Sequence, residues 1–298
     1  MSKRIYNNPV GTGKYTGLLL ILPFIAGFAV FTLYPFLFSF FMGMTDYNNI
    51  RPPEFVGLEN YKSLLKNRDF VKAVKVTFRY ALILVPLKLL FSLAVAVILS
   101  MEIKFRGFFR TAFYIPSILG ANLATVIMWQ YIFRSDGLLN QFMSVFGLPR
   151  LSWYGDSRLA VLIIVLLRLW EFGSTMLIFL NALNEIPKEL YESAKVDGCG
   201  GVRRFFLITL PMIKDTLFIN LVLQTISAFQ EFNAPYMLTG GNPVKSTYTV
   251  GMLIYDEMFT YSEAGTANAV SWLLFTGIAV TVSVMFAFDR RRKEKGGI

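Results

Sequence analysis

Long apolar stretches, separated by short polar segments, run through almost the whole chain. Tyr15–Thr45, Thr111–Phe133 and Ala264–Phe288 contain no charged residue, and Tyr80–Met101 contains only Lys88. A helix of about 20 apolar residues crosses the hydrocarbon core of a bilayer. The pattern therefore predicts six membrane-spanning helices, over residues 17–41, 78–101, 109–133, 159–183, 206–231 and 265–288.

The composition agrees with a membrane protein and excludes several other classes. Of the 298 residues, 55% are hydrophobic and 16% are charged, whereas about 25% are charged in a typical soluble domain. So little charge could not cover so much apolar surface in water, which excludes a soluble cytosolic enzyme. With no histidine and one cysteine, the chain cannot build a His/Cys zinc site, a histidine-dependent triad or an internal disulfide. We expect a single all-α transmembrane domain over residues 1–298, with no metal, cofactor or catalytic residue.

The basic residues indicate the orientation of the helices. Lys and Arg gather between the second and third predicted helices, between the fourth and fifth, and in the tail 290–295. Because cytoplasmic loops are enriched in Lys and Arg, both termini are predicted to be cytoplasmic, in the cell membrane of a prokaryote. The net charge of +10 is then mainly a topology signal, and anionic lipid headgroups, not nucleic acid, are its expected partner. The first helix is expected to be retained, because its apolar run is too long for a signal peptide.

The segment 186–211, between the fourth and fifth predicted helices, has the pattern of a helix-turn-helix. Pro187 suits the first position of a helix, and Gly198, followed by two more glycines, is typical of a helix end. A second short helix is expected to begin near Val202. Without further evidence, such a mixture of charges would indicate only a solvated cytoplasmic loop.

The spacing within this segment resembles the EAA loop of permease subunits of binding-protein-dependent ABC importers. That pattern is Glu-Ala-Ala, three residues, Gly, nine residues, then Ile-x-Leu-Pro. The chain has Glu192-Ser193-Ala194, Gly198 and Ile208-Thr209-Leu210-Pro211 at these spacings, with Ser193 in place of an alanine. Residues 55–61 and 238–243 are similar to segments of the sugar-transporting group often called carbohydrate uptake family 1. The resemblance extends over residues 17–288.

The resemblance implies the fold and the partners of an ABC type I importer permease. In that family the EAA segment is a coupling helix that docks into a cleft of a cytoplasmic ATPase subunit. The implied partners are a second homologous permease, two ABC ATPase subunits and an extracellular solute-binding protein that delivers a carbohydrate, with an oligosaccharide as the expected class. The chain itself lacks a phosphate-binding P-loop. The residues expected at the ATPase contact are Glu189, Leu190, Glu192, Ser193, Ala194, Val196, Asp197 and Gly198.

Two of these residues allow two interpretations of their side-chain contacts. Leu190 and Val196 could bury their side chains against the ATPase, or they could pack against the ends of the chain's own helices. Glu192 could pair with a basic residue of the ATPase.

Polar residues inside the predicted helices are candidates for a substrate path, because ionisable groups in a membrane are commonly functional. Arg168 and Glu171 are three residues apart and share one helix face, where they could line a path or form a structural ion pair with another helix. Amides and carboxylates beside aromatic rings suit sugars. The candidate path residues are Arg168, Glu171, Ser174, Gln224, Ser227, Gln230, Glu231 and Asn233.

Two other functions remain as alternatives. A glycerol phosphate ester is a possible substrate, because permeases for such esters resemble sugar permeases. A secondary transporter, which needs no ATPase, would usually contain an internal repeat of broken helices; the sequence shows no such repeat.

Overall fold

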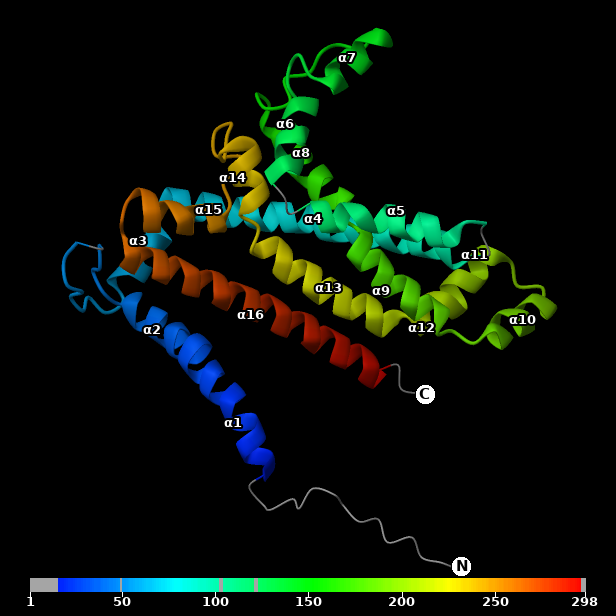
Figure 1. Cartoon of the computed structure of the whole chain (residues 1–298), viewed down its shortest axis with the longest axis horizontal. Helices are drawn as coiled ribbons and strands as arrows, with labels where there is room; N and C mark the ends of the chain where they lie inside the picture. Colours follow the sequence, from blue (N-terminus) through cyan, green and yellow to red (C-terminus); the bar gives the residue numbers. More distant parts are fainter. Residues whose placement is uncertain (1–15, 49, 102–103, 121–122, 296–298) are drawn as a thin grey trace, which may run out of the picture.

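The computed structural model describes residues 16–48, 50–101, 104–120 and 123–295, and this part of the chain is almost entirely helical (Figure 1). It contains no strand, apart from an isolated antiparallel bridge between Thr45 and Phe55. The helices before the predicted coupling segment are α1 (Thr16–Phe28), η1 (Ala29–Leu33), α2 (Tyr34–Met42), α3 (Glu59–Lys66), α4 (Arg68–Ser100), α5 (Arg106–Leu119), α6 (Leu123–Ile132), α7 (Leu138–Val145), α8 (Ser157–Trp170) and α9 (Gly173–Asn184). The later helices are α10 (Lys188–Val196), α11 (Gly201–Arg204), η2 (Phe205–Thr209), α12 (Leu210–Met212), α13 (Lys214–Phe229), α14 (Asn233–Thr239), α15 (Val250–Tyr255), η3 (Asp256–Thr260) and α16 (Ala264–Lys295).

Three helices are long and apolar enough to cross a membrane unbroken: Gly17–Met42, Arg68–Ser100 and Ala264–Arg291. The second of them, α4, begins ten residues before the predicted span 78–101. The reason is a helix cap that hydropathy does not detect: the Asn67 side chain accepts hydrogen bonds from the N–H groups of the next turn.

The other predicted spans are divided into helix pairs. The axes of α8 and α9 differ by 45°, and the helical segments Gly201–Met212 and Lys214–Phe229 differ by 69°. The pair α5 and α6 flanks residues 121–122, which lie outside the described segments. If each pair is one span, the described chain holds up to six. Broken helices in a membrane leave unpaired backbone groups that must be buried in protein or line a polar cavity, so the breaks indicate where to look for a site.

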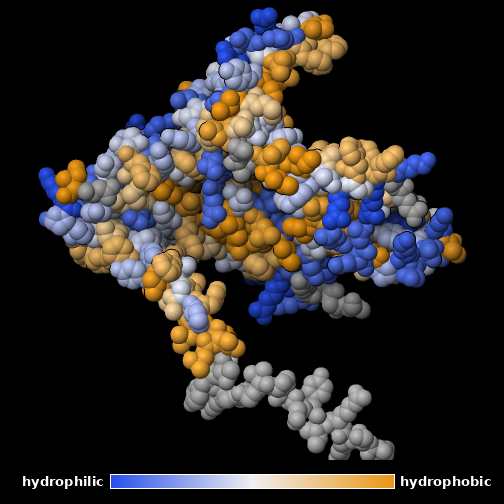
Figure 2. Space-filling view, in the orientation of Figure 1, coloured by the Kyte–Doolittle hydropathy of each residue, from blue (hydrophilic) through white to orange (hydrophobic). Residues whose placement is uncertain are grey.

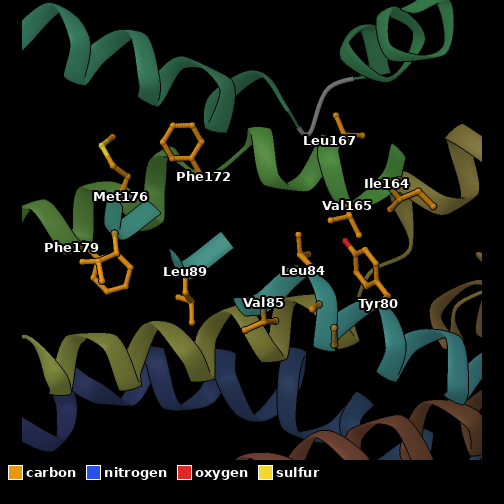
Figure 3. Close-up of a cluster of buried hydrophobic side chains, with 14 of the residues drawn as sticks. Tyr80, Leu84, Val85, Leu89, Ile164, Val165, Leu167, Phe172, Met176 and Phe179 are labelled. Carbon is orange, nitrogen blue, oxygen red and sulfur yellow. The ribbon is translucent and has the colours of Figure 1, made fainter. Parts of the chain in front are cut away.

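The core forms around α4, which packs against α8, α9 and α13. Figure 3 shows Leu84 and Val85 of α4 within this core, with Val165 of α8 and Phe179 of α9 among the side chains around them. A second, smaller cluster joins α3, α4, α15 and α16, and includes Leu64 and Phe70. The first cluster fixes the helices that surround the cavity described below.

The surface is apolar over the middle of the molecule and polar around the end that carries α10. Figure 2 shows hydrophobic residues over the middle of the molecule and hydrophilic residues around the end that carries α10. None of the most apolar window of Gly17–Met42 is buried inside the chain. This first helix therefore faces mainly lipid or another protein chain, and only its α2 part touches the chain's own fold, where the rings of Phe36 and Phe40 contact Trp272 of α16.

Close contact between α5 and α9 depends on a glycine. A side chain at Gly173 would place its Cβ less than 3.0 Å from the Phe113 carbonyl oxygen and the Tyr114 Cα. Backbone atoms cannot move aside as a flexible side chain can, so α5 would have to shift. The same contact includes a hydrogen bond of 3.1 Å from the Ser174 N–H to the Ser117 hydroxyl.

We expect Gly173→Ala to destabilise the protein by about 1 to 3 kcal/mol, the usual cost of overpacking. Gly277→Ala is the matched control, because nothing lies within 4 Å of a Cβ at Gly277 on α16 and alanine favours a helix over glycine. The measurement is thermal unfolding of both variants in detergent. Equal melting temperatures of the two variants would contradict the prediction.

Candidate functional site

A polar cavity of about 390 Å³ opens between α4, the break between α8 and α9, and the end of α13. Polar and charged side chains from all three places line it, together with a few apolar ones. The charged and polar lining residues are Lys88, Arg168, Glu171, Gln224, Ser227, Gln230, Glu231 and Asn233.

Arg168 holds two carboxylates in this cavity. Its Nε and Nη2 donate to the two oxygens of Glu231 at 2.7 and 2.9 Å, and its Nη1 donates to both oxygens of Glu171 at 2.9 and 2.8 Å. The side chains of Arg168, Glu171 and Glu231 are only 15%, 13% and 7% exposed. Such paired geometry compensates the burial of charges that would otherwise be costly in a membrane.

Besides its ion pair with Arg168, Glu231 accepts hydrogen bonds from three other parts of the chain. Its Oε1 also accepts a hydrogen bond of 3.1 Å from the Ala234 N–H in the first turn of α14, and its Oε2 accepts one of 3.4 Å from the Tyr80 hydroxyl of α4. Its backbone carbonyl accepts one of 2.8 Å from the Thr249 hydroxyl, beside α15. Glu231 therefore connects α4, α8, α14 and the start of α15.

The sequence places these groups at helix breaks. Arg168 lies in the last turn of α8, and Glu171 follows directly as the C-cap residue. Glu231 lies in the two-residue interval between Gln230, the C-cap of α13, and the start of α14. Acidic groups near a helix N-terminus are favourable, which suits Glu231 at the start of α14.

The remaining polar groups on α13 face the same space. Gln224 donates from its amide nitrogen to the Thr175 hydroxyl of α9 at 3.0 Å, so its amide oxygen is turned elsewhere. Ser227 and Gln230 are exposed to the cavity one and two turns further along. The cavity thus offers several neutral donors and acceptors, while its described cations, Lys88 and Arg168, are balanced by two carboxylates.

The structure brings together seven of the eight residues predicted for the path. Ser174 is the exception: it lies at the contact between α5 and α9 and does not line the cavity. The predicted path did not include Lys88, which lines the cavity and is 9% exposed. As the lone charge of its predicted span, Lys88 carried the same signal as Arg168 and Glu171, but only the packing of α4 shows which space its side chain faces.

The predicted coupling segment forms two short helices with a tight turn at the end of α10. Gly198 has a φ of +73°, its N–H donates to the Lys195 carbonyl at 3.1 Å, and the Cys199 N–H donates to the Ala194 carbonyl at 2.8 Å. This pair of bonds is a Schellman motif, which requires the left-handed conformation that glycine adopts without strain. The Tyr191 hydroxyl lies 2.9 Å from the Thr209 hydroxyl and ties α10 to η2.

The coupling residues lie on a surface that their own chain leaves open. Val196 is 87% exposed and Leu190 is 39% exposed, so Val196 does not pack against its own helix ends. Apart from Ala194, which is partly buried, the predicted coupling residues are exposed: Glu189, Leu190, Glu192, Ser193, Val196, Asp197 and Gly198.

Membrane-length apolar helices around a polar cavity, together with an exposed helix-turn-helix at one end, are the features of a helical membrane transport protein. Residues 88–294 match the family model described as the binding-protein-dependent transport system inner membrane component. The chain belongs to this family, whose members are permease subunits of ABC transporters.

Curated relatives agree over almost the whole chain. The "Probable ABC transporter permease protein YesP" of Bacillus subtilis (strain 168) is 39% identical and aligns with 91% of this chain and 89% of its own length. The "Trehalose/maltose transport system permease protein MalF" of Thermococcus litoralis is 32% identical, with 97% and 99% covered. The "Arabinooligosaccharides transport system permease protein AraP" of Bacillus subtilis (strain 168) is 31% identical, with 95% and 91% covered.

Solved structures show the same fold. A chain of a bacterial ABC transporter involved in the import of the acidic polysaccharide alginate superimposes with a TM-score of 0.81, covering 93% of this chain and 96% of that one, at 22% identity. A chain of a bacterial alginate ABC transporter in complex with an alginate pentasaccharide-bound periplasmic protein gives a TM-score of 0.82 at 21% identity, with 93% and 95% covered. The ABC importer permease fold implied by the sequence is therefore confirmed.

We expect Glu231→Ala to destabilise the protein by about 3 to 5 kcal/mol, because it leaves the buried Arg168 with one carboxylate fewer. The double variant Arg168→Met, Glu231→Gln removes one charge of each sign, leaves Glu171 to balance Lys88, and should be closer in stability to the unchanged protein. Thermal unfolding in detergent measures both.

The control for this prediction is Asp136→Ala. It breaks the ion pair between Arg134 and Asp136, whose side chains are 53% and 71% exposed, respectively. Exposed ion pairs contribute less than about 1 kcal/mol to stability. A double variant Arg168→Met, Glu231→Gln less stable than Glu231→Ala would show that the removed pair is net stabilising and contradict the argument.

Proposed function

We propose that this chain is a permease subunit of an ATP-driven importer for a carbohydrate, most simply an oligosaccharide, in the cell membrane of a prokaryote. The cavity is its part of the translocation path, and α10 with its Gly198 turn is the coupling helix for a cytoplasmic ATPase. The complete importer contains a second permease, two ATPase subunits and an extracellular solute-binding protein, and both termini of this chain are cytoplasmic. Membership of the permease family supports this proposal most directly.

The chemistry of the cavity supports a neutral sugar. Gln224, Ser227, Gln230 and Asn233 supply hydrogen-bond donors and acceptors for hydroxyl groups, and Phe232 supplies an aromatic face for the C–H side of a sugar ring. Two of the relatives described above are named for arabinooligosaccharide and trehalose/maltose transport. A carbohydrate is therefore the substrate class that the cavity and the relatives favour together.

The cavity favours a carbohydrate over a glycerol phosphate ester. A phosphate group is commonly bound by an arginine with free donors, but Arg168 already donates to four carboxylate oxygens. Glu171 and Glu231 would also repel a phosphate. An ester would have to rely on Lys88, which lies close enough to Glu171 and Glu231 for their charges to act on it.

Filling the cavity tests its place in the path. We expect Ser227→Leu to lower oligosaccharide uptake at least about tenfold in proteoliposomes that contain the complete importer, because the larger side chain occupies the cavity and removes a hydroxyl. Ser283→Leu on α16 is the matched control, since Ser283 is also an exposed serine but lies outside the cavity. Uptake by Ser227→Leu equal to that of Ser283→Leu would contradict the proposed path.

The turn after α10 tests coupling. We expect Gly198→Ala to weaken ATPase binding, because alanine at a φ of +73° costs about 1 to 2 kcal/mol and displaces the end of α10. Gly200→Ala is the control: Gly200 has a φ of −69° and an open Cβ position. Glu192→Ala should weaken binding with the backbone unchanged. Co-purification of the ATPase with each variant, at equal amounts of membrane-inserted permease, gives the measurement.

The same purification distinguishes an importer from a secondary transporter. The importer requires that a P-loop ATPase and a second permease purify with this chain. Purification of the chain alone, together with normal uptake by the Gly198→Ala and Glu192→Ala variants, would favour the ATP-independent alternative.

A further inference from the structure

Four aromatic rings form a continuous cluster that reaches the cavity at one end, here called the aromatic ladder: Phe232, Tyr236, Tyr255 and Phe259. The ring centroids of Phe259 and Tyr255 are 5.0 Å apart, those of Tyr255 and Phe232 are 5.2 Å apart, and Tyr236 lies 5.0 Å from both Phe232 and Tyr255. The rings come from the junction before α14, from α14 itself, from α15 and from η3. In Figure 1, α14 and α15 lie in the half of the molecule away from α10.

The ladder leads from an open surface to the cavity. Phe259, at one end, is 70% exposed, and Tyr236 is 40% exposed. Phe232, at the other end, is partly buried and lines the cavity beside Glu231 and Asn233. Ring contacts therefore connect the outer surface with the cavity without a gap.

Hydrophobic packing does not explain the outer rings. Tyr236, Tyr255 and Phe259 belong to neither of the two apolar clusters and are not among the residues packed against them, whereas Phe232 packs against the smaller one. The ladder's outer three residues thus keep large rings at positions where the described core gains little from them.

Hydrogen-bonding groups neighbour the rings along the chain. The carboxylate of Asp256 accepts a hydrogen bond of 2.6 Å from the Tyr248 hydroxyl and one of 3.3 Å from the Thr260 hydroxyl, and it retains free lone pairs. Asp256 follows Tyr255 in the chain, and Thr260 follows Phe259. Rings flanked by oxygen acceptors are the combination that carbohydrates need, because a sugar ring offers an apolar C–H face and hydroxyl groups at its rim.

We propose that the aromatic ladder is a second carbohydrate-binding site, which holds the part of an oligosaccharide that extends beyond the cavity on its way in. This inference rests on the proposed carbohydrate substrate and adds a length requirement to it. A short sugar fits inside the cavity and does not need the ladder. A longer one stacks its outer rings on Tyr255, Tyr236 and Phe259.

A membrane-interface belt is the competing explanation, because Tyr and Trp gather at the level of the lipid headgroups. A belt residue anchors the protein and has no preference for sugar length. The two explanations therefore differ in one measurable quantity, the dependence of uptake on the number of sugar units.

The test compares Phe259→Leu with the unchanged protein in proteoliposomes that contain the complete importer. The probes are malto-, arabino- and alginate oligosaccharides, from the disaccharide to the hexasaccharide, and the measurement is the concentration that gives half-maximal uptake. We expect it to rise about 3- to 10-fold for the longer members of the transported series, as the loss of one stacking contact implies, and to stay unchanged for the shortest. Phe259→Trp keeps a ring and should restore the value.

Two further variants keep the result interpretable. Phe288→Leu on α16 is the matched control for anchoring, because Phe288 is 67% exposed and remote from the ladder in sequence; it should leave uptake of every length unchanged. Tyr236→Leu removes a different ring of the ladder and should reproduce the length-dependent effect if Phe259→Leu inserts poorly.

The proposed binding role of the ladder would be overturned by either of two results. One is an equal loss of uptake at every sugar length, and the other is no loss of uptake at any length in both Phe259→Leu and Tyr236→Leu. If Ser227→Leu still impairs uptake in that case, the proposed carbohydrate path stands without it. If no oligosaccharide is transported by the unchanged importer while the ATPase is active, the proposed substrate class itself is wrong. The two failures are therefore distinguishable.

Discussion

The buried ion-paired cluster of Arg168, Glu171 and Glu231 is the interaction on which the rest of the arrangement depends. An arginine within a membrane helix is costly unless its charge is compensated, and here two carboxylates, one at the end of α8 and one between α13 and α14, accept its hydrogen bonds. The compensation fixes α8 against the junction of α13 and α14. Tyr80 extends the connection to α4, the helix around which the core is built. Removing one member of this cluster therefore affects the positions of several helices at once.

The breaks in the helices and the cavity are consequences of one another. A polar cavity inside a membrane protein needs polar groups that can reach it, and helix ends supply such groups. Glu171 and Glu231 both lie just beyond a helix end. The bend of 45° between α8 and α9 and the junction after α13 turn the carboxylates toward Arg168. Because Lys88 and Arg168 together balance the two carboxylates, the remaining amides and hydroxyls define the character of the cavity, which suits an uncharged, hydroxyl-rich ligand.

One stretch of chain joins the coupling segment to the cavity. The chain leaves α10 through the Gly198 turn, continues through α11, η2 and α12, and enters α13, whose far end carries the cavity residues. The hydrogen bond between Tyr191 and Thr209 holds α10 against this stretch. A displacement of α10 can therefore be transmitted to the first turn of α13 through this short stretch of backbone and through the hydrogen bond between Tyr191 and Thr209. This continuity gives the proposed coupling a physical basis, and the bend of 69° at Ile213 is where the route changes direction.

Local sequence was enough to predict the positions and approximate extent of the apolar segments, the helix-turn-helix of residues 186–211 and the set of polar residues on the fourth and fifth predicted spans, although the structure divides three of the six predicted spans into bent helix pairs. These features depend on local composition and on the conformational limits of single residues, such as the left-handed turn at Gly198. Only the tertiary structure decided that Arg168 pairs with Glu231, 63 residues away, that Lys88 lines the cavity and that Ser174 does not. It also brought Phe232 and Phe259 into one aromatic ladder. Such contacts depend on how separate helices pack and bend. The hydrophobic pattern along the chain does not specify which helix faces contact one another.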